Sequence, residues 1–323
     1  MNATLLSQLA KLPKLLDPEI RRKNLQLVGW RMREARWRLL RPATPDPVFV
    51  IGCSRSGTTI TFETIAACER YRHFPWELPQ FWNSLAGPAH NGWASEAATA
   101  EDACPEHRAR ALAYYYARLG AGQVLDKTCI NTLRVGYLHA LFPRARFVFI
   151  HRDGRDNVSS MIDGWRLGRS DGGFGLEKFL GPSPEAVAIN GGEFREWHFF
   201  LPPGWRQYNH ASLEEACAFQ WVSANRLALD GARLVPEAQW IRVRYEDIFE
   251  RPEAMFREVF ERLEVPFDDK LERRCRALVA RPTSVVKGRP ARQKWRQNNP
   301  EAIERIVDTI APMMRELGYD PDD

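Results

Sequence analysis

Short apolar runs, separated by longer segments of helical periodicity, dominate the chain from residue 48 onward. Residues 48–51 (VFVI) and 145–150 (ARFVFI) are apolar without alternation, which predicts strands buried on both faces of a sheet. Residues 123–127 and a run that begins at Trp240 predict two further strands. Strands that alternate with helices are typical of a parallel sheet flanked by helices on both faces. The pattern therefore predicts an α/β fold, in which ligands bind beyond the carboxyl ends of the strands.

Helical periodicity marks the segments between and after these strands. The expected helices lie over about residues 58–67, 101–119, 131–142, 156–165, 213–230, 252–263 and 268–279. A closing amphipathic helix runs to Leu317, and Pro312 inside it is expected to produce a kink. Residues 168–192 instead hold seven glycines and two prolines, which predicts a long loop or lid.

The N-terminal region is strongly basic. Residues 11–41 contain ten Lys or Arg and three Asp or Glu, whereas the whole chain carries a net charge of +5. Leu27, Trp30 and Trp37 recur here at near-helical spacing, which predicts a basic amphipathic helix. Such a helix either contacts a membrane surface or another anionic polymer, or packs on the protein with a solvated charged face. The sequence leaves both interpretations open.

The cysteines and the first residues bear on redox state and location. The six cysteines are scattered, with no CxxC pair and no metal-ligand spacing, so we expect free thiols and no metal site. The apolar patch in residues 1–16 is too short for a spanning helix and lacks the regional order of a signal peptide. We therefore expect a cytoplasmic protein with no nucleic-acid partner, and a homodimer stays open.

The first strand leads into a glycine-rich loop, residues 52–59 (GCSRSGTT). Its two glycines stand in the G-x-x-x-x-G frame of phosphate-binding loops, but Thr58 takes the place of the lysine that reaches the terminal phosphates of ATP or GTP. Backbone N–H groups at the next helix, the hydroxyls of Thr58 and Thr59, and the guanidinium of Arg55 can still hold a phosphate. We expect a loop that binds a phosphate without being built for a triphosphate and magnesium, although such turns also occur without a ligand.

A second anion site is expected in residues 146–165 (RFVFIHRDGRDNVSSMIDGW). The buried strand places Arg152 at its carboxyl end, and Ser160 follows eight residues later in the next helix, which Asp153 or Asp156 can cap. A guanidinium and a hydroxyl beside a helix N-terminus suit a second phosphate. Two separate phosphate sites indicate a nucleotide that carries phosphates at both ends of its ribose.

With these motifs the chain resembles the sulfotransferase family that uses 3′-phosphoadenosine 5′-phosphosulfate (PAPS), in particular bacterial members and tyrosylprotein sulfotransferases. CSRSGTT is similar to the family's PRSGTT-like loop, and HRDGRDNVSS is similar to its VRDGR…S element. Lys294-Trp295 and the closing IAPMMRELGYDP resemble a KW pair followed by a final helix. The resemblance runs from about Val48 to Pro321 but fails over roughly 168–212. It implies the P-loop-like sulfotransferase fold.

The resemblance also implies a domain plan and a donor site. A helical segment, 1–45, would precede a single α/β domain, 46–323, with a variable insertion near 168–212. PAPS would be the co-substrate and adenosine 3′,5′-bisphosphate (PAP) the product, with no metal. The residues that match donor-binding positions of the family are Ser54, Arg55, Ser56, Gly57, Thr58, Thr59, Arg152, Ser160, Tyr245, Lys287 and Lys294.

Four residues match catalytic positions. Glu77, twenty-two residues after Arg55, is the expected base that takes the proton of the acceptor hydroxyl, with His73 in reserve. Arg55 and Lys127 would stabilise charge at the leaving phosphate. Ser284 resembles a family serine near the donor, although its spacing to Lys287 departs from the family. These four residues are Arg55, Glu77, Lys127 and Ser284.

Each assignment has a plainer alternative. Glu77 is otherwise a carboxylate at a helix start, Lys127 a surface partner of Asp126, and Tyr245 a core aromatic at a strand end. Gly164 stands where the family has a basic residue four positions after the helix serine, and Arg166 is a candidate substitute.

Two other functional classes remain at this stage. A small-molecule kinase with a degraded loop would need magnesium and ATP, and a catalytically inactive nucleotide-binding protein would bind PAP without turnover. The sequence does not identify the hydroxyl acceptor, which could be a carbohydrate, a lipid, a natural product or a tyrosine.

Overall fold

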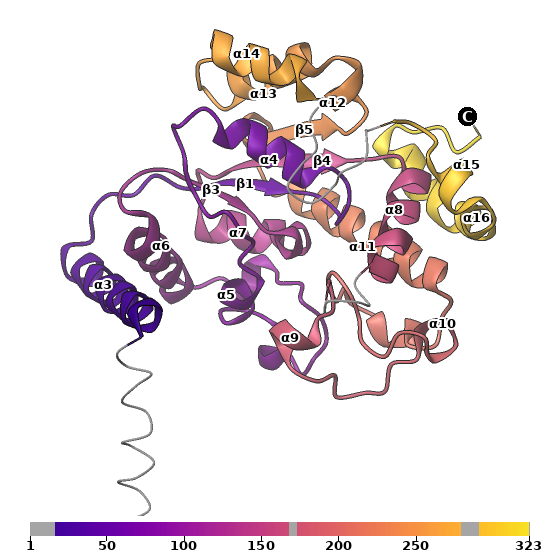
Figure 1. The fold of residues 1–323 in the computed structure, drawn as a ribbon, viewed down its shortest axis with the longest axis horizontal. Helices are drawn as coiled ribbons and strands as arrows, with labels where there is room; N and C mark the ends of the chain where they lie inside the picture. The colour runs from indigo at the N-terminus through magenta and orange to yellow at the C-terminus, as the bar shows by residue number, and fades with distance from the viewer. Residues whose placement is uncertain (1–16, 168–172, 279–290, 323) are drawn as a thin grey trace, which may run out of the picture. The chain divides into compact units, whose positions relative to one another are not determined.

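The computed structural model describes residues 17–167, 173–278 and 291–322. These residues form two compact units, and Figure 1 shows their elements along the chain. The first unit holds residues 17–45 and Pro105–Gly122, so residues 105–122 are grouped with the N-terminal helix. The second unit holds Asp46–Cys104 and the chain from Gln123 onward.

The first unit consists of two helices that pack on each other. They are α3 (Pro18–Leu40) and α6 (Pro105–Leu119). Asp17 caps α3, because its side chain accepts hydrogen bonds from the backbone N–H groups of Glu19 and Ile20. Helix α6 starts at Pro105 and not near residue 101, because residues 100–102 form a separate 3₁₀ turn.

The second unit is built on a parallel sheet of five strands in the order β2-β3-β1-β4-β5. The strands are β1 (Val48–Ile51), β2 (Arg72–His73), β3 (Val124–Lys127), β4 (Arg146–His151) and β5 (Trp240–Arg244). The four strands expected from the sequence are all present, whereas the two-residue strand β2 was not predicted. Strand β1 lies at the centre, and the carboxyl ends of its neighbours β3 and β4 flank the glycine-rich loop.

Helices cover both faces of this sheet, as the apolar runs predicted. One core cluster joins Val48, Val50 and Val148 to apolar side chains of α4 (Thr58–Ala66), α13 (Pro252–Arg262) and α14 (Asp269–Arg276). Side chains that point to the opposite face of the sheet, such as Phe49 and Phe147, stack in the other core layer. Figure 1 shows α7, α8 and α11 on that second side.

The remaining helices of the second unit connect and close the fold. They are α5 (Pro79–Asn83), α7 (Val135–Leu141), α8 (Gly154–Leu167), α9 (Glu177–Leu180), α10 (Ile189–Gly192), α11 (Leu213–Ala232), α12 (Asp247–Glu250), α15 (Trp295–Asn298) and α16 (Pro300–Leu317). Helix α16 contains Pro312 within its length. The helix expected over 131–142 divides instead into a 3₁₀ segment, η3 (Cys129–Arg134), and α7. Within the described ranges, none of the helices combines the length and apolar character that a membrane crossing requires.

Candidate active site

The loop after β1 wraps tightly because of its backbone conformation. Gly57 has φ 101°, and a Cβ there would collide with the ring of Tyr245, which follows β5. Arg55 also has a positive φ, 71°. The backbone N–H of Ser56 donates to the carbonyl of Cys53 at 3.1 Å, which closes the turn. The loop thus places Gly57 and the first residues of α4 at the edge of the sheet. Only glycine fits at position 57, because the ring of Tyr245 lies so close to it.

The two expected anion sites lie side by side. Nε of Arg55 lies 3.3 Å from Oγ of Ser160 on α8, and Nη1 of Arg152 donates to the carbonyl of Arg55 at 3.1 Å. The guanidinium of Arg152 stacks over the ring of Tyr245, 4.5 Å from its centroid. Burial, and then the nearby charge of Arg152, lower the pKa of Arg55. Two cations held together and out of water favour an anionic ligand between them.

A second cluster lies at the carboxyl end of β3. Nζ of Lys127 lies 2.7 Å from Oε1 of Glu77 and 3.5 Å from Oγ1 of Thr59 at the start of α4. The other carboxylate oxygen of Glu77 accepts the backbone N–H of Cys129 at 2.8 Å. Burial opposes the charged form of Lys127, but the Glu77 carboxylate, together with Cys129 and Glu63, outweighs this effect and raises the pKa of Lys127. The ammonium ion and the carboxylate are therefore held as a pair beside the loop.

The plainer alternatives for this cluster do not fit. Lys127 pairs with Glu77 and not with Asp126, whose buried carboxylate accepts hydrogen bonds from Trp82 and Thr128. Glu77 precedes α5 and bonds to residues of β3 and η3, so it is not a capping carboxylate of its own helix. His73 packs edge-on against Phe62 and is not among the residues that line the cavity described below.

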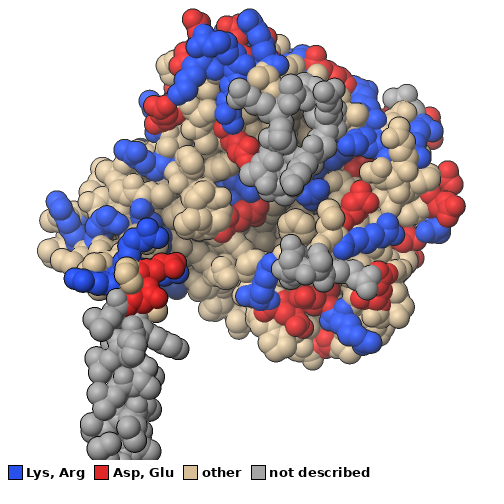
Figure 2. Space-filling view, viewed as in Figure 1, with Lys and Arg blue, Asp and Glu red and all other residues tan. Residues whose placement is uncertain are grey.

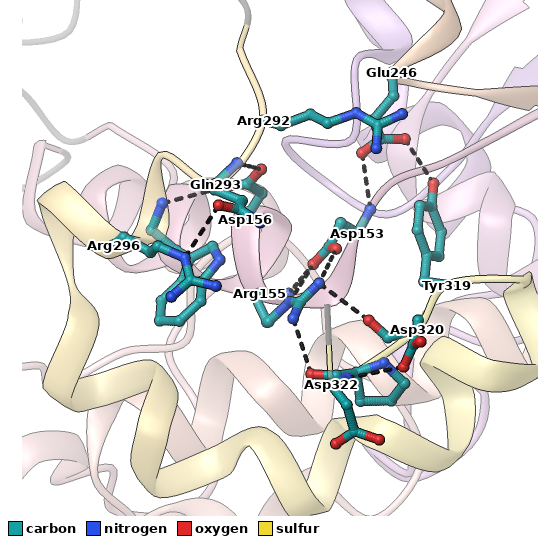
Figure 3. A network of polar contacts seen from close by, with 12 residues as sticks. Asp153, Arg155, Asp156, Glu246, Arg292, Gln293, Arg296, Tyr319, Asp320 and Asp322 are labelled. Atoms are coloured by element: carbon teal, nitrogen blue, oxygen red, sulfur yellow. Dashed lines mark hydrogen bonds and ion pairs between the residues drawn. The ribbon is translucent and has the colours of Figure 1, made fainter.

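A third group ties the C-terminal segment to α8, as Figure 3 shows. The carboxylate of Asp156 accepts the backbone N–H groups of Gln293 at 2.8 Å and Trp295 at 3.0 Å. These bonds fix the backbone on either side of Lys294. Burial raises the pKa of Asp156, and the charge of Arg152 opposes that effect. Asp153 accepts the backbone N–H of Arg155 at 2.9 Å, so Asp153 is the residue that caps the start of α8.

Most of the expected site residues line one cavity of about 680 Å³. Its lining combines basic, acidic and apolar residues. The expected residues that line it are Ser54, Arg55, Gly57, Thr58, Thr59, Glu77, Arg152, Ser160, Tyr245 and Lys294. Ser56 is fully buried within the loop, and Lys127 reaches the cavity through Glu77 and Thr59. Ser284 and Lys287 lie outside the described residues.

A comparison with known protein families matches a region that contains most of these cavity residues. The model of the sulfotransferase family matches residues 47–183 and 187–269, which is more than half of the chain. The chain belongs to the sulfotransferase family.

Relatives and solved structures agree with this placement. The protein-tyrosine sulfotransferase A of Caenorhabditis elegans is 29% identical over 200 residues, which cover 57% of this chain and 42% of that protein. The Drosophila melanogaster protein-tyrosine sulfotransferase is 26% identical over 205 residues, 59% of this chain and 33% of the relative. The matches thus span less than half of either relative. The crystal structure of sulfotransferase STF9 from Mycobacterium avium shares the fold, with a TM-score of 0.57, 14% identity, and coverage of 89% of this chain and 82% of that one.

One departure from the sulfotransferase pattern is filled by a neighbouring ring. A side chain at Gly164 on α8 would displace Phe199, because a Cβ there would lie 2.7 Å from the tip of that ring. Arg166 does not replace the missing basic residue at the cavity. Its Nη1 donates to Asn299 at 3.0 Å, and it is not among the lining residues.

The cavity is also lined by polar residues that were not predicted from the sequence as site residues: Gln80, Cys129, Asp156, Ser159, Asp163 and Asn298. Cys129 contacts Glu77, Asp156 holds the segment around Lys294, and Asp163 lines the cavity. Asp163 lies one helical turn after Ser160, a spacing that could have indicated it. No local signal connects Asp156 with Gln293, because the two residues are 137 positions apart.

Proposed function

We propose that this protein transfers a sulfuryl group from PAPS to a hydroxyl-bearing acceptor. The observation that carries the proposal is that Arg55, Ser160 and Glu77 line one cavity, where Lys127 pairs with Glu77. A kinase of the P-loop type would need a lysine after Gly57, where Thr58 stands. A protein that only binds PAP would not need a partly buried carboxylate and ammonium pair beside the loop.

The donor fits the residues present. Nε of Arg152 is buried and has no hydrogen-bond partner among the described residues, although Arg152 lines the cavity. An orphaned guanidinium nitrogen of this kind suits a phosphate oxygen. Arg152 and Ser160 would hold the 3′-phosphate, and Arg55 with the start of α4 would hold the 5′-phosphate. PAPS would supply a sulfuryl group already joined to a phosphate that can leave with the bonding electrons.

Glu77 is the proposed base. Its carboxylate lines the cavity and is oriented by two donors, the ammonium of Lys127 and the N–H of Cys129. A base held in this way can take the hydroxyl proton as the acceptor oxygen forms its bond to sulfur and the bond from sulfur to the phosphate breaks. Lys127 lies between Glu77 and Thr59, so its charge is available to the leaving phosphate.

The acceptor is proposed to present an apolar surface around its hydroxyl. Away from the loop, the lining of the cavity is mainly apolar and comes from residues 76–79, η3, the end of α8 and residues 173–199. These apolar lining residues are Trp76, Pro79, Ile130, Leu167, Phe174, Leu176, Phe179 and Phe199. Such walls favour a phenol or an apolar alcohol over a polyanionic sugar.

Two measurements test the proposal in sequence. A thermal-shift comparison should show stabilisation by PAP at concentrations at which ATP with magnesium has little effect. Transfer from labelled PAPS to a panel of phenols, sterols, sugars and tyrosine peptides should then label acceptors of the apolar classes. Stronger stabilisation by ATP and magnesium than by PAP would contradict the sulfotransferase activity. Labelling of sugars alone would contradict only the acceptor class.

A further inference from the structure

Helix α3 exposes an apolar stripe on the face that it turns away from α6. Leu25, Val28, Met32 and Leu39 are between 53% and 83% exposed. With Ala35, which is also exposed, they recur at alternating spacings of three and four residues. At about 100° per residue, this spacing aligns them along one side of the helix. Large apolar side chains seldom form a continuous exposed row on the surface of a soluble protein.

The opposite side of α3 contacts α6. Nε of Arg33 donates to the carbonyl of Ala117 on α6 at 2.6 Å, and the guanidinium of Arg118 lies over the ring of Trp30 at 4.8 Å. Trp37, one turn beyond Arg33, is buried. The face of α3 that carries Trp30 and Arg33 therefore packs on α6, and the buried Trp37 lies on this same face. The apolar stripe lies roughly opposite to it around the helix axis.

Arginines border the stripe, and Figure 2 shows Lys and Arg gathered over this helix. By helical position, Arg21 continues the stripe, Arg22 and Arg36 lie along one edge, and Arg31 along the other. Their side chains make no ion pair with the described part of the chain. The acidic residues of α3 are neutralised within the helix, because Glu19 pairs with Lys23 at 2.9 Å and Glu34 with Arg38 at 2.8 Å.

We propose that this face of α3 binds the surface of an anionic lipid bilayer. The apolar stripe would enter the boundary between headgroups and acyl chains, and the bordering arginines would contact the lipid phosphates. Charge complementarity favours this occupant over a second copy of the chain, because pairing two α3 stripes would bring like-charged arginine borders together. This proposal does not depend on the enzymatic one.

Vesicle sedimentation with the full chain tests the proposal. The wild-type protein should sediment with vesicles of phosphatidylcholine mixed with phosphatidylglycerol, sediment little with phosphatidylcholine alone, and be released by high salt. Met32→Asp should lower the bound fraction at least about tenfold, and Met32→Ser should lower it less. Leu234→Asp is the matched control, since Leu234 is 56% exposed but lies in the second unit.

The charge contribution is tested separately. Arg31→Gln with Arg36→Gln should weaken binding to the anionic vesicles about tenfold or more, because each arginine near such a surface contributes about fivefold. The matched double variant Arg233→Gln with Arg273→Gln removes two exposed arginines of the second unit and should bind as the wild type does. Circular dichroism and PAP binding verify that each variant is folded.

Three results would overturn the proposal. They are no sedimentation with anionic vesicles, equal sedimentation with neutral ones, and equal losses in the control variants. Light scattering supplies a further check. A wild-type dimer that Met32→Asp converts to monomer would show that a second copy covers the stripe, and this too would overturn the lipid assignment.

Discussion

The ammonium of Lys127 and the carboxylate of Glu77 lie 2.7 Å apart, although fifty residues separate them in the chain. They meet because Lys127 ends β3, and because the segment after β2, the edge strand beside β3, brings Glu77 to the same edge of the sheet. Thr59, at the start of α4, lies on the other side of Lys127. The pair thus links the proposed base to the phosphate-binding loop.

Glu77→Gln is expected to keep PAP binding and to lower turnover at least about a hundredfold. The amide keeps nearly the same shape but cannot take the acceptor proton. Glu304→Gln, which alters an exposed carboxylate on α16, is the matched control. The measurements are turnover with labelled PAPS and calorimetric binding of PAP. Unchanged turnover in Glu77→Gln would remove Glu77 from the role of base.

Arg152→Ala is expected to weaken PAP binding at least about tenfold more than it weakens AMP binding. The reason is that its orphaned guanidinium nitrogen is assigned to the 3′-phosphate, which AMP lacks, and a charge-assisted hydrogen bond contributes about 1.5–3 kcal/mol. Titration of both nucleotides with both proteins gives the comparison. An equal loss for PAP and AMP would show that the 3′-phosphate is bound elsewhere.

Asp156→Asn is expected to act through Lys294. One oxygen of Asp156 would become an amide nitrogen facing a backbone N–H of the Gln293–Trp295 segment, which would displace that segment. PAP affinity should fall about as far in Asp156→Asn as in Lys294→Met. The double variant should then be little worse than either single one, because both changes remove the same contact. Full additivity would show that Asp156 does not position Lys294.

Cys129 is expected to react slowly with iodoacetamide at neutral pH, although it lines the cavity. Burial, and then the Glu77 carboxylate, raise the pKa of the Cys129 thiol to about 12, so little thiolate is present. Alkylation should accelerate as pH rises toward that value. Glu77→Gln should speed the reaction at a fixed pH, since it removes a negative charge that disfavours the thiolate. Mass spectrometry identifies the site, and a rate already at its plateau by pH 8 would contradict this prediction.

His198 is expected to make stability fall in mild acid. Burial, and then Lys178, lower its pKa from 6.5 to about 4, and its ring stacks on Trp165 with centroids 4.4 Å apart. Between these values the unfolded chain binds a proton that the folded chain does not. The contribution of His198 to the free energy of unfolding should therefore drop by about 1.4 kcal/mol per pH unit as pH falls from 6 to 4.5.

The variant His198→Phe should remove this contribution. The free energy of unfolding of the variant minus that of the wild type should rise by about 1.4 kcal/mol per pH unit as pH falls from 6 to 4.5. The same difference should stay constant between pH 7 and 8. Urea denaturation at each pH measures the difference. A constant difference at every pH would show that His198 titrates alike in both states.

The sequence by itself determined four of the five strands, most of the longer helices and the chemistry of the loops. Unbroken apolar runs predicted β1 and β4, because a strand buried on both faces must be apolar at every position. The loop of residues 52–59 and Arg152 were also evident, because each directly follows a strand, and Ser160 lies in the helix that comes next after Arg152.

Only the tertiary structure decided which of these groups meet. The strand order places β3 and β4 on either side of β1, and this order brings Lys127, Arg55 and Arg152 to one edge. Periodicity records how deeply each position is buried but not which strand lies beside it. The contacts of Asp156 with Gln293 and of Gly164 with Phe199 join segments far apart in the chain, and no local pattern predicts them.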